Sequence, residues 1–309
     1  MYRYVIKRLL MLIPVILGVI LMIFIVMDLA PGDPVLMIAS PDATEEELDA
    51  LRTELGLDKG LIYRYVAYVR NMLKGNLGTS YTTKRPVMEV YMERLPETVK
   101  LAVGAVLIAV VVSIPLGIIA AVRQNTWADS MSMVVALIGI SMPSFWLGLL
   151  LMLLFSLRLH LFPSGGTGGF KNIVLPSVTL GMSLTAVMTR TTRSSMLDVL
   201  RSDYLRTARA KGVDEDKVIL KHAFKNALIP IITIFGSQFS YVLGGAVLVE
   251  TIFSYPGVGK MVVDAIGNRD IPSVTGGIVM TTIIVTCVNL VIDLMYAFVD
   301  PRIKGQYVK

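Results

Sequence analysis

Few residues in this chain have the types and spacing needed for nucleotide chemistry. Gly257-Val-Gly-Lys260 has part of the spacing of a phosphate-binding loop, but Ser254 stands where its first glycine should be and Met261 where Ser or Thr should follow the lysine. The glycine-rich stretch 163–169 is not followed by Gly-Lys-Ser/Thr, and it predicts a flexible external turn. No nucleotide site is expected, so any use of ATP must come from a partner.

The ionisable residues do not form a catalytic or ion-conducting set. His160 and His222 are the two histidines, and we expect them on opposite sides of a membrane. Asp28, Lys100 and Asp293 lie towards the ends of apolar runs, whereas ion-coupled transporters usually place ionisable residues deep in the membrane. The sequence therefore disfavours a membrane enzyme and an ion-coupled secondary transporter or channel. No catalytic or metal-binding residue is predicted.

The residues best placed to contact another protein lie in the basic segment 204–230. Helix-forming residues alternate with basic ones up to Gly212, where a glycine in the left-handed region would end a helix. Asp214 can cap a second helix. The pattern predicts a helix, a tight turn and a helix, and the small alanines before the glycine would let another surface approach closely. A plain solvated basic loop is the alternative interpretation.

Composition places these segments in a membrane protein. Of 309 residues, 54% are hydrophobic and 17% charged, and the mean hydropathy is +0.68. The apolar residues come in blocks of about twenty, the length that crosses a bilayer. The formal charge of +6 could suggest nucleic acid, but the basic residues cluster beside the apolar blocks, so the positive-inside rule explains them. The single Cys287 rules out an intrachain disulfide.

The charge pattern predicts six spans with the N- and C-termini both in the cytoplasm. The predicted spans cover about 9–30, 101–122, 131–157, 173–189, 231–249 and 278–299. Basic residues flank both ends, namely Arg3, Lys7 and Arg8 before the first span and Arg302, Lys304 and Lys309 after the last. A cleaved signal peptide is disfavoured, because its apolar core would be shorter.

The expected domain organisation follows from these spans. Its parts are a cytoplasmic N-terminus (1–8), a first span (9–30), an extracytoplasmic helical excursion (31–98) and a membrane core (99–309) with five spans and a cytoplasmic loop at 190–230. We expect Arg190 and Arg193 to begin that loop. The fourth span is rich in Ser, Thr and Gly, which suits a helix packed against other helices and away from lipid.

The segment 31–98 is predicted to form a small helical cap outside the membrane. Thr44 and Glu47 form a capping box for its first helix. A second, amphipathic helix carries an apolar face, and a third short helix covers about 86–95. The apolar residues expected on the second helix are Ile62, Val66, Val69 and Leu73.

Polar residues inside the predicted spans are candidates for a substrate pathway. The string Ser141-Met-Pro-Ser-Phe-Trp146 predicts a kink in the third span, because proline removes a backbone donor. The candidate residues are Ser141, Pro143, Ser144, Phe145, Gln238, Ser240 and Asn289. A purely structural role is the alternative for all of them. The residues near Pro143 would form the kink, and the polar side chains would make hydrogen bonds between helices.

Several strings resemble one family of transport proteins. Arg206-Thr-Ala-Arg-Ala-Lys-Gly212, followed by Lys221-His-Ala-Phe-Lys-Asn-Ala-Leu-Ile-Pro230, is similar to the cytoplasmic coupling loop of ABC importer permeases. Arg206-Thr207-Ala208 replaces the Glu-Ala-Ala of the general pattern, and this variant resembles the dipeptide/oligopeptide branch. The strings 75–80, 250–257 and 268–272 resemble the same branch, so the likeness covers nearly the whole chain.

This resemblance implies an all-α integral membrane protein with six transmembrane helices, like other type I ABC importers. It implies that the loop docks into a groove on an ATPase subunit through Tyr204, Arg206, Thr207, Ala208, Arg209, Ala210, Lys211 and Gly212. The implied partners are a homologous second permease, two ABC ATPase subunits and an extracytoplasmic substrate-binding protein. ATP and Mg²⁺ would be bound by the ATPases, so no cofactor is expected in this chain. Short peptides are the implied cargo, with nickel or glutathione-like cargo as the alternative.

Overall fold

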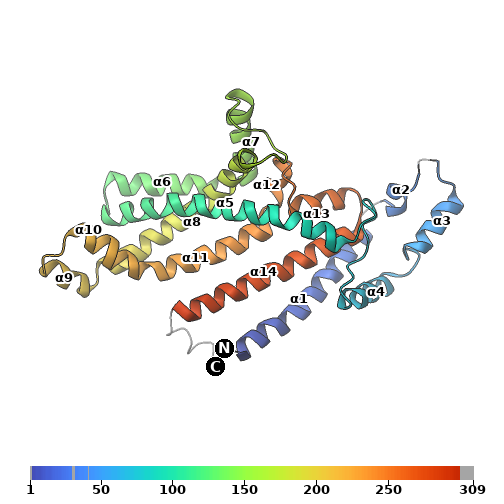
Figure 1. Ribbon diagram of the computed structural model, residues 1–309, viewed down its shortest axis with the longest axis horizontal. Helices are drawn as coiled ribbons and strands as arrows, with labels where there is room; N and C mark the ends of the chain where they lie inside the picture. The colour runs from blue at the N-terminus through green and yellow to red at the C-terminus, as the bar shows by residue number, and fades with distance from the viewer. Residues whose placement is uncertain (1, 30–31, 41, 300–309) are drawn as a thin grey trace. The chain divides into compact units, whose positions relative to one another are not determined.

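The computed structural model describes residues 2–29, 32–40 and 42–299. The expected end of the first span at Ala30 and the C-terminal residues Arg302, Lys304 and Lys309 lie outside these ranges. Helices and their connections make up the described residues, with no β-strand among them. The helices are α1 (Tyr2–Leu29), α2 (Pro34–Ile38), α3 (Glu45–Glu54), α4 (Leu61–Leu73), α5 (Val87–Val122), α6 (Trp127–Ser141), α7 (Ser144–Leu151), the π-helical η1 (Met152–Arg158), α8 (Phe170–Leu200), α9 (Asp203–Ala210), α10 (Glu215–Lys217), the π-helical η2 (Val218–Ala223), α11 (Phe224–Gly245), α12 (Val247–Ile252), α13 (Val258–Gly267) and α14 (Ile271–Val299) (Figure 1).

The chain divides into two compact units. Unit 1 comprises Met1–Thr98 and Pro256–Cys287, and unit 2 comprises Val99–Tyr255 and Val288–Lys309. Unit 1 holds α1 to α4 and α13, and unit 2 holds α6 to α12.

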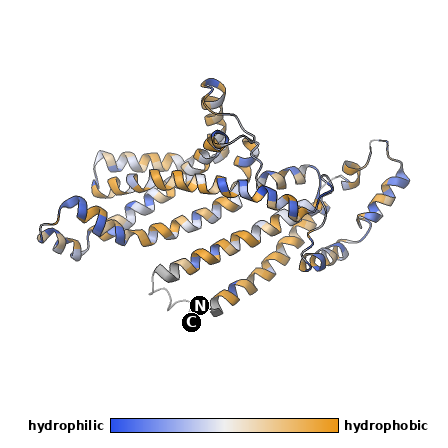
Figure 2. Ribbon diagram, viewed as in Figure 1, coloured by the Kyte–Doolittle hydropathy of each residue, from blue (hydrophilic) through white to orange (hydrophobic). Residues whose placement is uncertain are grey.

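Among the described residues, five helices are long and apolar enough to cross a membrane. They are Val5–Leu29, Val87–Val122, Phe170–Leu200, Glu215–Gly245 and Ile271–Met295. The bent pair formed by α6 and the α7–η1 segment brings the number to six if the pair is one span. Hydrophobic residues run along the lengths of α1, α5 and α14 (Figure 2). The chain therefore has the expected all-α membrane architecture.

Two helices extend further than the sequence predicted. The expected short helix at 86–95 is wrong, because α5 continues from Val87 to Val122 and Pro96 removes one backbone donor without ending it. The predicted start of the cytoplasmic segment at Arg190 stays a prediction, although the segment begins as a continuation of a helix and not as a loop. Helix α8 continues to Leu200, so Arg190 and Arg193 lie on a helix. Its Ser and Thr residues did not end the helix, because packing against neighbours overrides weak local propensity.

The expected kink at Pro143 is a complete break. Helix α6 ends at Ser141, α7 begins at Ser144, and the two halves meet at 100°. Met142 has φ −87° and ψ 119°, an extended conformation that follows from the steric demand of proline on the residue before it.

Helix α8 forms the centre of unit 2, where it packs against α6, α7 and α11. It is the most buried of the five long apolar helices. Small residues permit this close packing: a Cβ added at Gly181 would lie 2.9 Å from the backbone oxygen of Ala105, and one at Gly117 would lie 2.5 Å from Cβ of Thr192. The Ser, Thr and Gly content of this span is thus explained by helix contact, as expected.

The turn at 163–169 is held by close contacts. Gly166 donates a backbone hydrogen bond of 3.0 Å to the carbonyl of Phe253, and a Cβ at Gly165 would lie only 2.0 Å from that oxygen. Asn172 donates from Nδ2 to the carbonyl of Gly165 at 2.9 Å. This turn therefore packs against the segment after α12 within unit 2.

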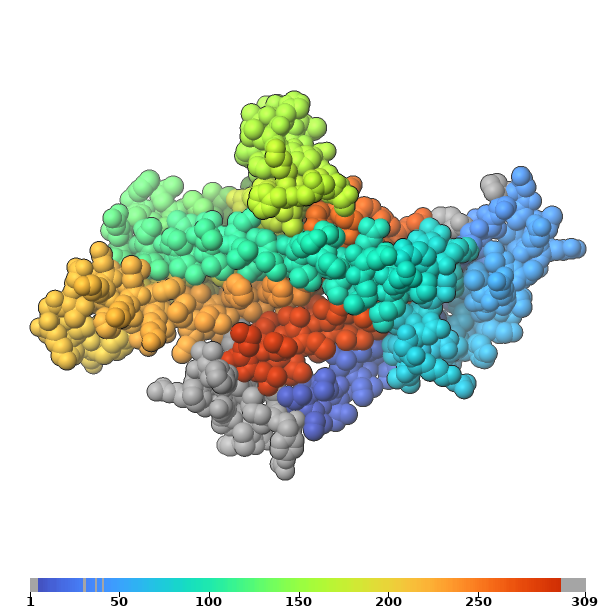
Figure 3. All heavy atoms as spheres, in the orientation of Figure 1, coloured from blue at the N-terminus to red at the C-terminus, as the bar shows by residue number. Residues whose placement is uncertain are grey.

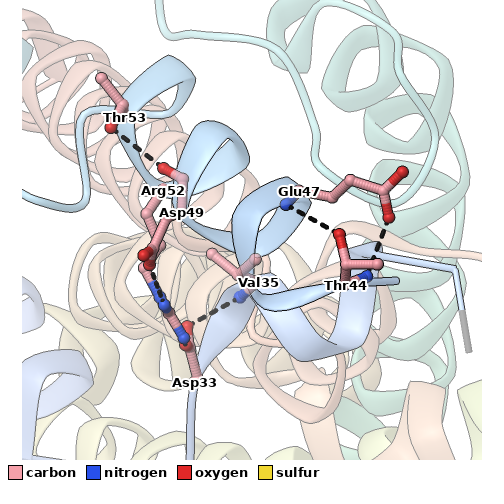
Figure 4. A network of polar contacts seen from close by, with 7 residues as sticks. All are labelled: Asp33, Val35, Thr44, Glu47, Asp49, Arg52 and Thr53. Carbon is pink, nitrogen blue, oxygen red and sulfur yellow. Dashed lines mark hydrogen bonds and ion pairs between the residues drawn. The ribbon is translucent and has the colours of Figure 1, made fainter. Parts of the chain in front are cut away.

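Local capping organises α2 and α3 in unit 1 (Figure 4). The predicted box is confirmed: Glu47 N–H donates to Thr44 Oγ1 at 3.4 Å, and Thr44 N–H donates to the Glu47 carboxylate at 2.9 Å. Asp33 accepts from the N–H of Val35 at 3.0 Å and from Arg52 Nη2 at 2.7 Å. The carboxylate of Asp33 thereby joins the start of α2 to α3.

Another contact in unit 1 joins two strings that the sequence singled out separately. Ser80, from the 75–80 string, donates from Oγ to the carboxylate of Asp270, from the 268–272 string. The same carboxylate accepts from the N–H of Tyr81 at 3.1 Å and from Ser273 Oγ at 2.9 Å. Asp270 is only 2% exposed, so these donors replace the water that a carboxylate otherwise needs.

Candidate functional site

The basic segment folds as a helix, a turn and a second helix. Helix α9 ends at Ala210, and Gly212 follows with φ +75°, the left-handed conformation that favours glycine. The N–H of Gly212 donates 2.9 Å to the carbonyl of Arg209, and that of Val213 donates 3.3 Å to Ala208. Asp214 lies at the N-cap of α10, as expected, but its side chain makes no capping hydrogen bond. The glycine stop is confirmed.

A small apolar core holds this segment against the ends of the long helices of unit 2. Leu205 of α9 is completely buried, as are Val218 and Ala223 of η2. They pack with Met196 near the end of α8 and with Ala121 at the end of α5. The segment is therefore packed against α5, α8 and α11 through apolar side chains.

Seven of the eight candidate coupling residues are exposed. These are Tyr204, Arg206, Thr207, Arg209, Ala210, Lys211 and Gly212. Ala208 is half-buried and packs against the apolar core instead. Within unit 2, α9 and α10 extend beyond the ends of α8 and α11, and the same segment projects from that end in the space-filling view (Figure 3). The arrangement leaves one side of α9 free for a partner.

Two polar contacts cross the turn. Arg209 donates from Nε and Nη2 to the carboxylate of Glu215 at 2.9 and 2.7 Å. The hydrogen bond with Glu215 raises the pKa of Arg209, so the guanidinium stays charged. Asn226 donates from Nδ2 to Tyr204 Oη at 3.0 Å and to the carbonyl of His222 at 2.8 Å. These contacts fix α9 relative to the start of α11.

The sequence did not single out several residues that position this site. Arg193 of α8 donates from Nε and Nη2 to Asp129 of α6 at 2.6 and 2.7 Å, and Asp129 is 5% exposed. Leu220 of η2 is 60% exposed beside the basic residues. Spacing gives no signal for the Asp129–Arg193 pair, whereas an apolar residue within a basic stretch is visible in the sequence.

The candidate pathway residues lie on different elements of unit 2. Ser141, Pro143 and Phe145 are exposed at the break between α6 and α7, and Ser144 is half-buried there. The others are Gln238 and Ser240 on α11 and Asn289 on α14. Ser240 is buried, and its hydroxyl has no hydrogen-bond partner among the described residues. Both α7 and α11 pack against α8, but no hydrogen bond among the described residues joins these candidates.

Among the described residues, no group of three or more His, Cys, Asp or Glu side chains is arranged to hold a metal ion. His160 is exposed after η1, and His222 is half-buried in η2. Of the candidate sites, the basic segment 204–230 is the one whose residues lie together in a defined arrangement.

Comparison with known families decides what kind of protein carries this segment. The family described as the inner membrane component of binding-protein-dependent transport systems matches residues 113–305, and the N-terminal family of the same components matches residues 1–102. The chain belongs to this family. It is an integral inner-membrane protein and a permease subunit of an ABC importer, which confirms the assignment made from the basic segment and its companion strings.

Individual relatives match over almost the full length. The chain is 42% identical over 304 residues to the glutathione transport system permease protein GsiC of Escherichia coli K12, covering 98% of this chain and 99% of that protein. The protein of the same name from Salmonella typhimurium LT2 matches equally, at 42% over 304 residues with the same coverage.

Solved structures share the fold of this permease. One is the inward-facing MetNI methionine ABC transporter, with a TM-score of 0.59 and 16% identity over 69% of this chain and 97% of that chain. Another is an amino acid ABC transporter solved with histidines, with a TM-score of 0.55 and 13% identity over 68% of this chain and 94% of that chain. At such low identity the likeness concerns the fold alone, which is that of type I ABC importers.

Proposed function

We propose that this permease imports short peptides, a class that includes the tripeptide glutathione, and that residues 204–230 couple it to an ATPase. This cargo class is supported by relatives that are named for glutathione transport and that match 98% of this chain. Glutathione-like cargo, with nickel, is the alternative to di- and oligopeptides, and the glutathione permeases fit that alternative. Glutathione and dipeptides share a free amine, a carboxylate and amide groups, so one pathway lined by polar groups can serve both.

The proposed coupling mechanism is supported by the packing of the basic segment. Because Leu205 and Val218 are buried against the ends of the long helices, a displacement of α9 by a partner would be transmitted to them. The exposed residues of α9 and its turn would form the docking face. ATP and Mg²⁺ would be bound by two ATPase subunits, and a second permease and an extracytoplasmic binding protein would complete the complex. Closure of the ATPases would then switch the permeases between outward- and inward-open states.

The proposed orientation places both termini and α9 in the cytoplasm. In a Cys287→Ser background, a single cysteine at Lys217 should react with an impermeant thiol reagent only after the membrane is opened. A cysteine at Glu46 should react from outside. Both positions are exposed, and Glu46 is preferred to its neighbour Glu47 because Glu47 closes the capping box. The reverse pattern would contradict the orientation.

The decisive test of function is uptake into proteoliposomes. The complete complex should take up labelled glutathione and dipeptides when ATP is supplied on the ATPase side, and it should leave labelled nickel outside. This chain alone should neither hydrolyse ATP nor move solute under an imposed proton gradient. Gradient-driven uptake by this chain alone would overturn the proposal, and ATP-driven uptake of nickel without peptides would overturn the cargo.

A further inference from the structure

Helix α4 of unit 1 packs against α1 through one face only. Tyr65 and Tyr68 lie against Phe24, with ring centroids 6.3 and 5.7 Å apart. Tyr65 Oη donates a hydrogen bond of 3.3 Å to the carbonyl of Leu17, and Arg64 forms an ion pair with Asp28. Leu61, Val69 and Met72 pack on the same face, so the buried face of α4 combines aromatic and aliphatic side chains.

These contacts give the depth of α4 along α1. The apolar run of α1 covers Val5–Leu29, and Leu17 is its midpoint. At 1.5 Å per residue, Leu17 lies about 18 Å from Leu29, which is about half the thickness of a bilayer with its headgroups. Because the contacts extend from Asp28 to Leu17, α4 lies at the level of one leaflet rather than beyond the membrane. In Figure 1 α4 is foreshortened while α1 runs lengthwise, so the two helices cross.

One flank of α4, next to the face that packs against α1, carries an exposed apolar stripe. Ile62, Val66 and Leu73 are 76%, 56% and 78% exposed, and their spacing of four and seven residues places them on one side of the helix. Of the four residues expected on one apolar face, Val69 packs against α1 beside Tyr65 and Tyr68, and the other three are exposed. Met22 and Val26 of α1 are also exposed and lie at the same depth. The apolar stripe of α4 is therefore at the same level as apolar surface of the span α1.

The opposite flank of α4 is polar. Arg70, Asn71 and Lys74 are exposed, and Asn71 helps to line a cavity of about 470 Å³ together with Tyr63 and Ala67. An apolar stripe with aromatic residues on one side and cations on the other is the pattern of a helix that lies in the membrane interface. Arginine and lysine at its edge suit the phosphate groups of lipids.

We propose that α4 is an interfacial helix whose stripe, Ile62, Val66 and Leu73, contacts the acyl chains of the leaflet at the Leu29 end of α1. Arg70 and Lys74 lie at the level of the lipid phosphates, and the polar flank faces water. The connection between α1 and α5 is thereby anchored on the membrane and is not a cap held away from it. The depth of the contacts with α1 favours lipid over a soluble partner protein.

Spin labels test this directly in the full chain, reconstituted in liposomes alone and with its co-purified partners. Single cysteines replace Ile62, Val66 and Leu73 in a Cys287→Ser background, and Asn71→Cys on the polar flank is the matched control. The ratio of collision with oxygen to collision with a water-soluble nickel chelate should be several-fold higher at the three stripe positions than at residue 71. A ratio equal to that of the control would show water, and low access to both reagents would show a protein contact; either result overturns the proposal.

Tryptophan fluorescence quenching provides a second measurement of lipid contact, and it uses a different substitution from the spin labels. In a Trp127→Phe, Trp146→Phe background, Val66→Trp should be quenched several-fold more by brominated phosphatidylcholine than Asn71→Trp. Iodide in the buffer should quench the two in the opposite order. Stronger iodide quenching at position 66 than at position 71 would overturn lipid contact even if the spin-labelled chains failed to fold.

Discussion

The amide of Asn226 donates a hydrogen bond of 3.0 Å to the hydroxyl of Tyr204, across 22 residues of chain that include the turn at Gly212. The same amide donates 2.8 Å to the carbonyl of His222. One side chain therefore joins α9 to the beginning of α11. It adds a polar contact to the apolar packing of Leu205 against the same helices.

Removal of this bond should weaken coupling without unfolding the chain. Tyr204→Phe keeps the ring and removes the hydroxyl, which accepts from Asn226 and also donates 3.4 Å to the carbonyl of His222. Each lost bond contributes about 0.5–1.5 kcal/mol in a typical protein. We expect fewer peptides imported per ATP hydrolysed by the reconstituted complex. Asn226→Ala also removes the bond to the carbonyl of His222, so its loss should be at least as large, and the double variant should lose less than the sum of the two single variants. Fully additive losses would show that the two residues act independently.

The conformation of Gly212 should be essential for the loop. Its φ of +75° is strained for a β-branched residue, and no atom lies within 4 Å of an added Cβ, so the effect of a substitution is conformational and not steric. Gly212→Val should cost about 1–2 kcal/mol locally and abolish transport while the chain still inserts. Gly212→Asn is the control, because asparagine tolerates the left-handed region. Equal activity of the two variants in uptake assays would contradict this role.

Close packing at Gly181 should determine the stability of unit 2. A Cβ there would lie 2.9 Å from the backbone oxygen of Ala105, whereas one at Gly245 would meet nothing nearer than 3.8 Å. Gly181→Ala should therefore destabilise by about 1–3 kcal/mol through overpacking. Gly245→Ala should be neutral or slightly stabilising, because alanine favours helix. Heating in detergent followed by size-exclusion chromatography compares the two, and equal midpoints would contradict the prediction.

The contact between α2 and α3 should depend on pH through Asp33. Partial burial alone would raise the pKa of this carboxyl, but hydrogen bonds from Val35 N–H and from Arg52 more than offset burial, so the pKa is lowered. The stabilisation is complete above the ordinary aspartate value of about 3.9 and is lost as pH falls through the lowered value. Hydrogen exchange of residues 33–55, corrected for intrinsic rates, should show loss of protection only in strong acid. Asp33→Asn should lack this transition and be less protected at neutral pH.

Hydropathy and local chain chemistry determined much of this protein from sequence alone. The long apolar helices, the capping box of Thr44 and Glu47 and the turn at Gly212 all depend on residues near each other in the chain. A capping bond spans three residues, and a left-handed glycine needs only its own backbone freedom. The family of the permease was also visible, because its strings are local.

Only the tertiary structure decided which distant residues meet. Ser80 and Asp270 are 190 residues apart, and Asp129 and Arg193 are 64 apart, so no spacing rule could pair them. The break at Pro143 follows from proline chemistry, but its angle of 100° depends on the contacts of α7 with α8 and α12. Likewise the buried face of α4 is set by distant residues, because Tyr65, Tyr68 and Val69 pack against a cluster that includes Ile20 and Phe24.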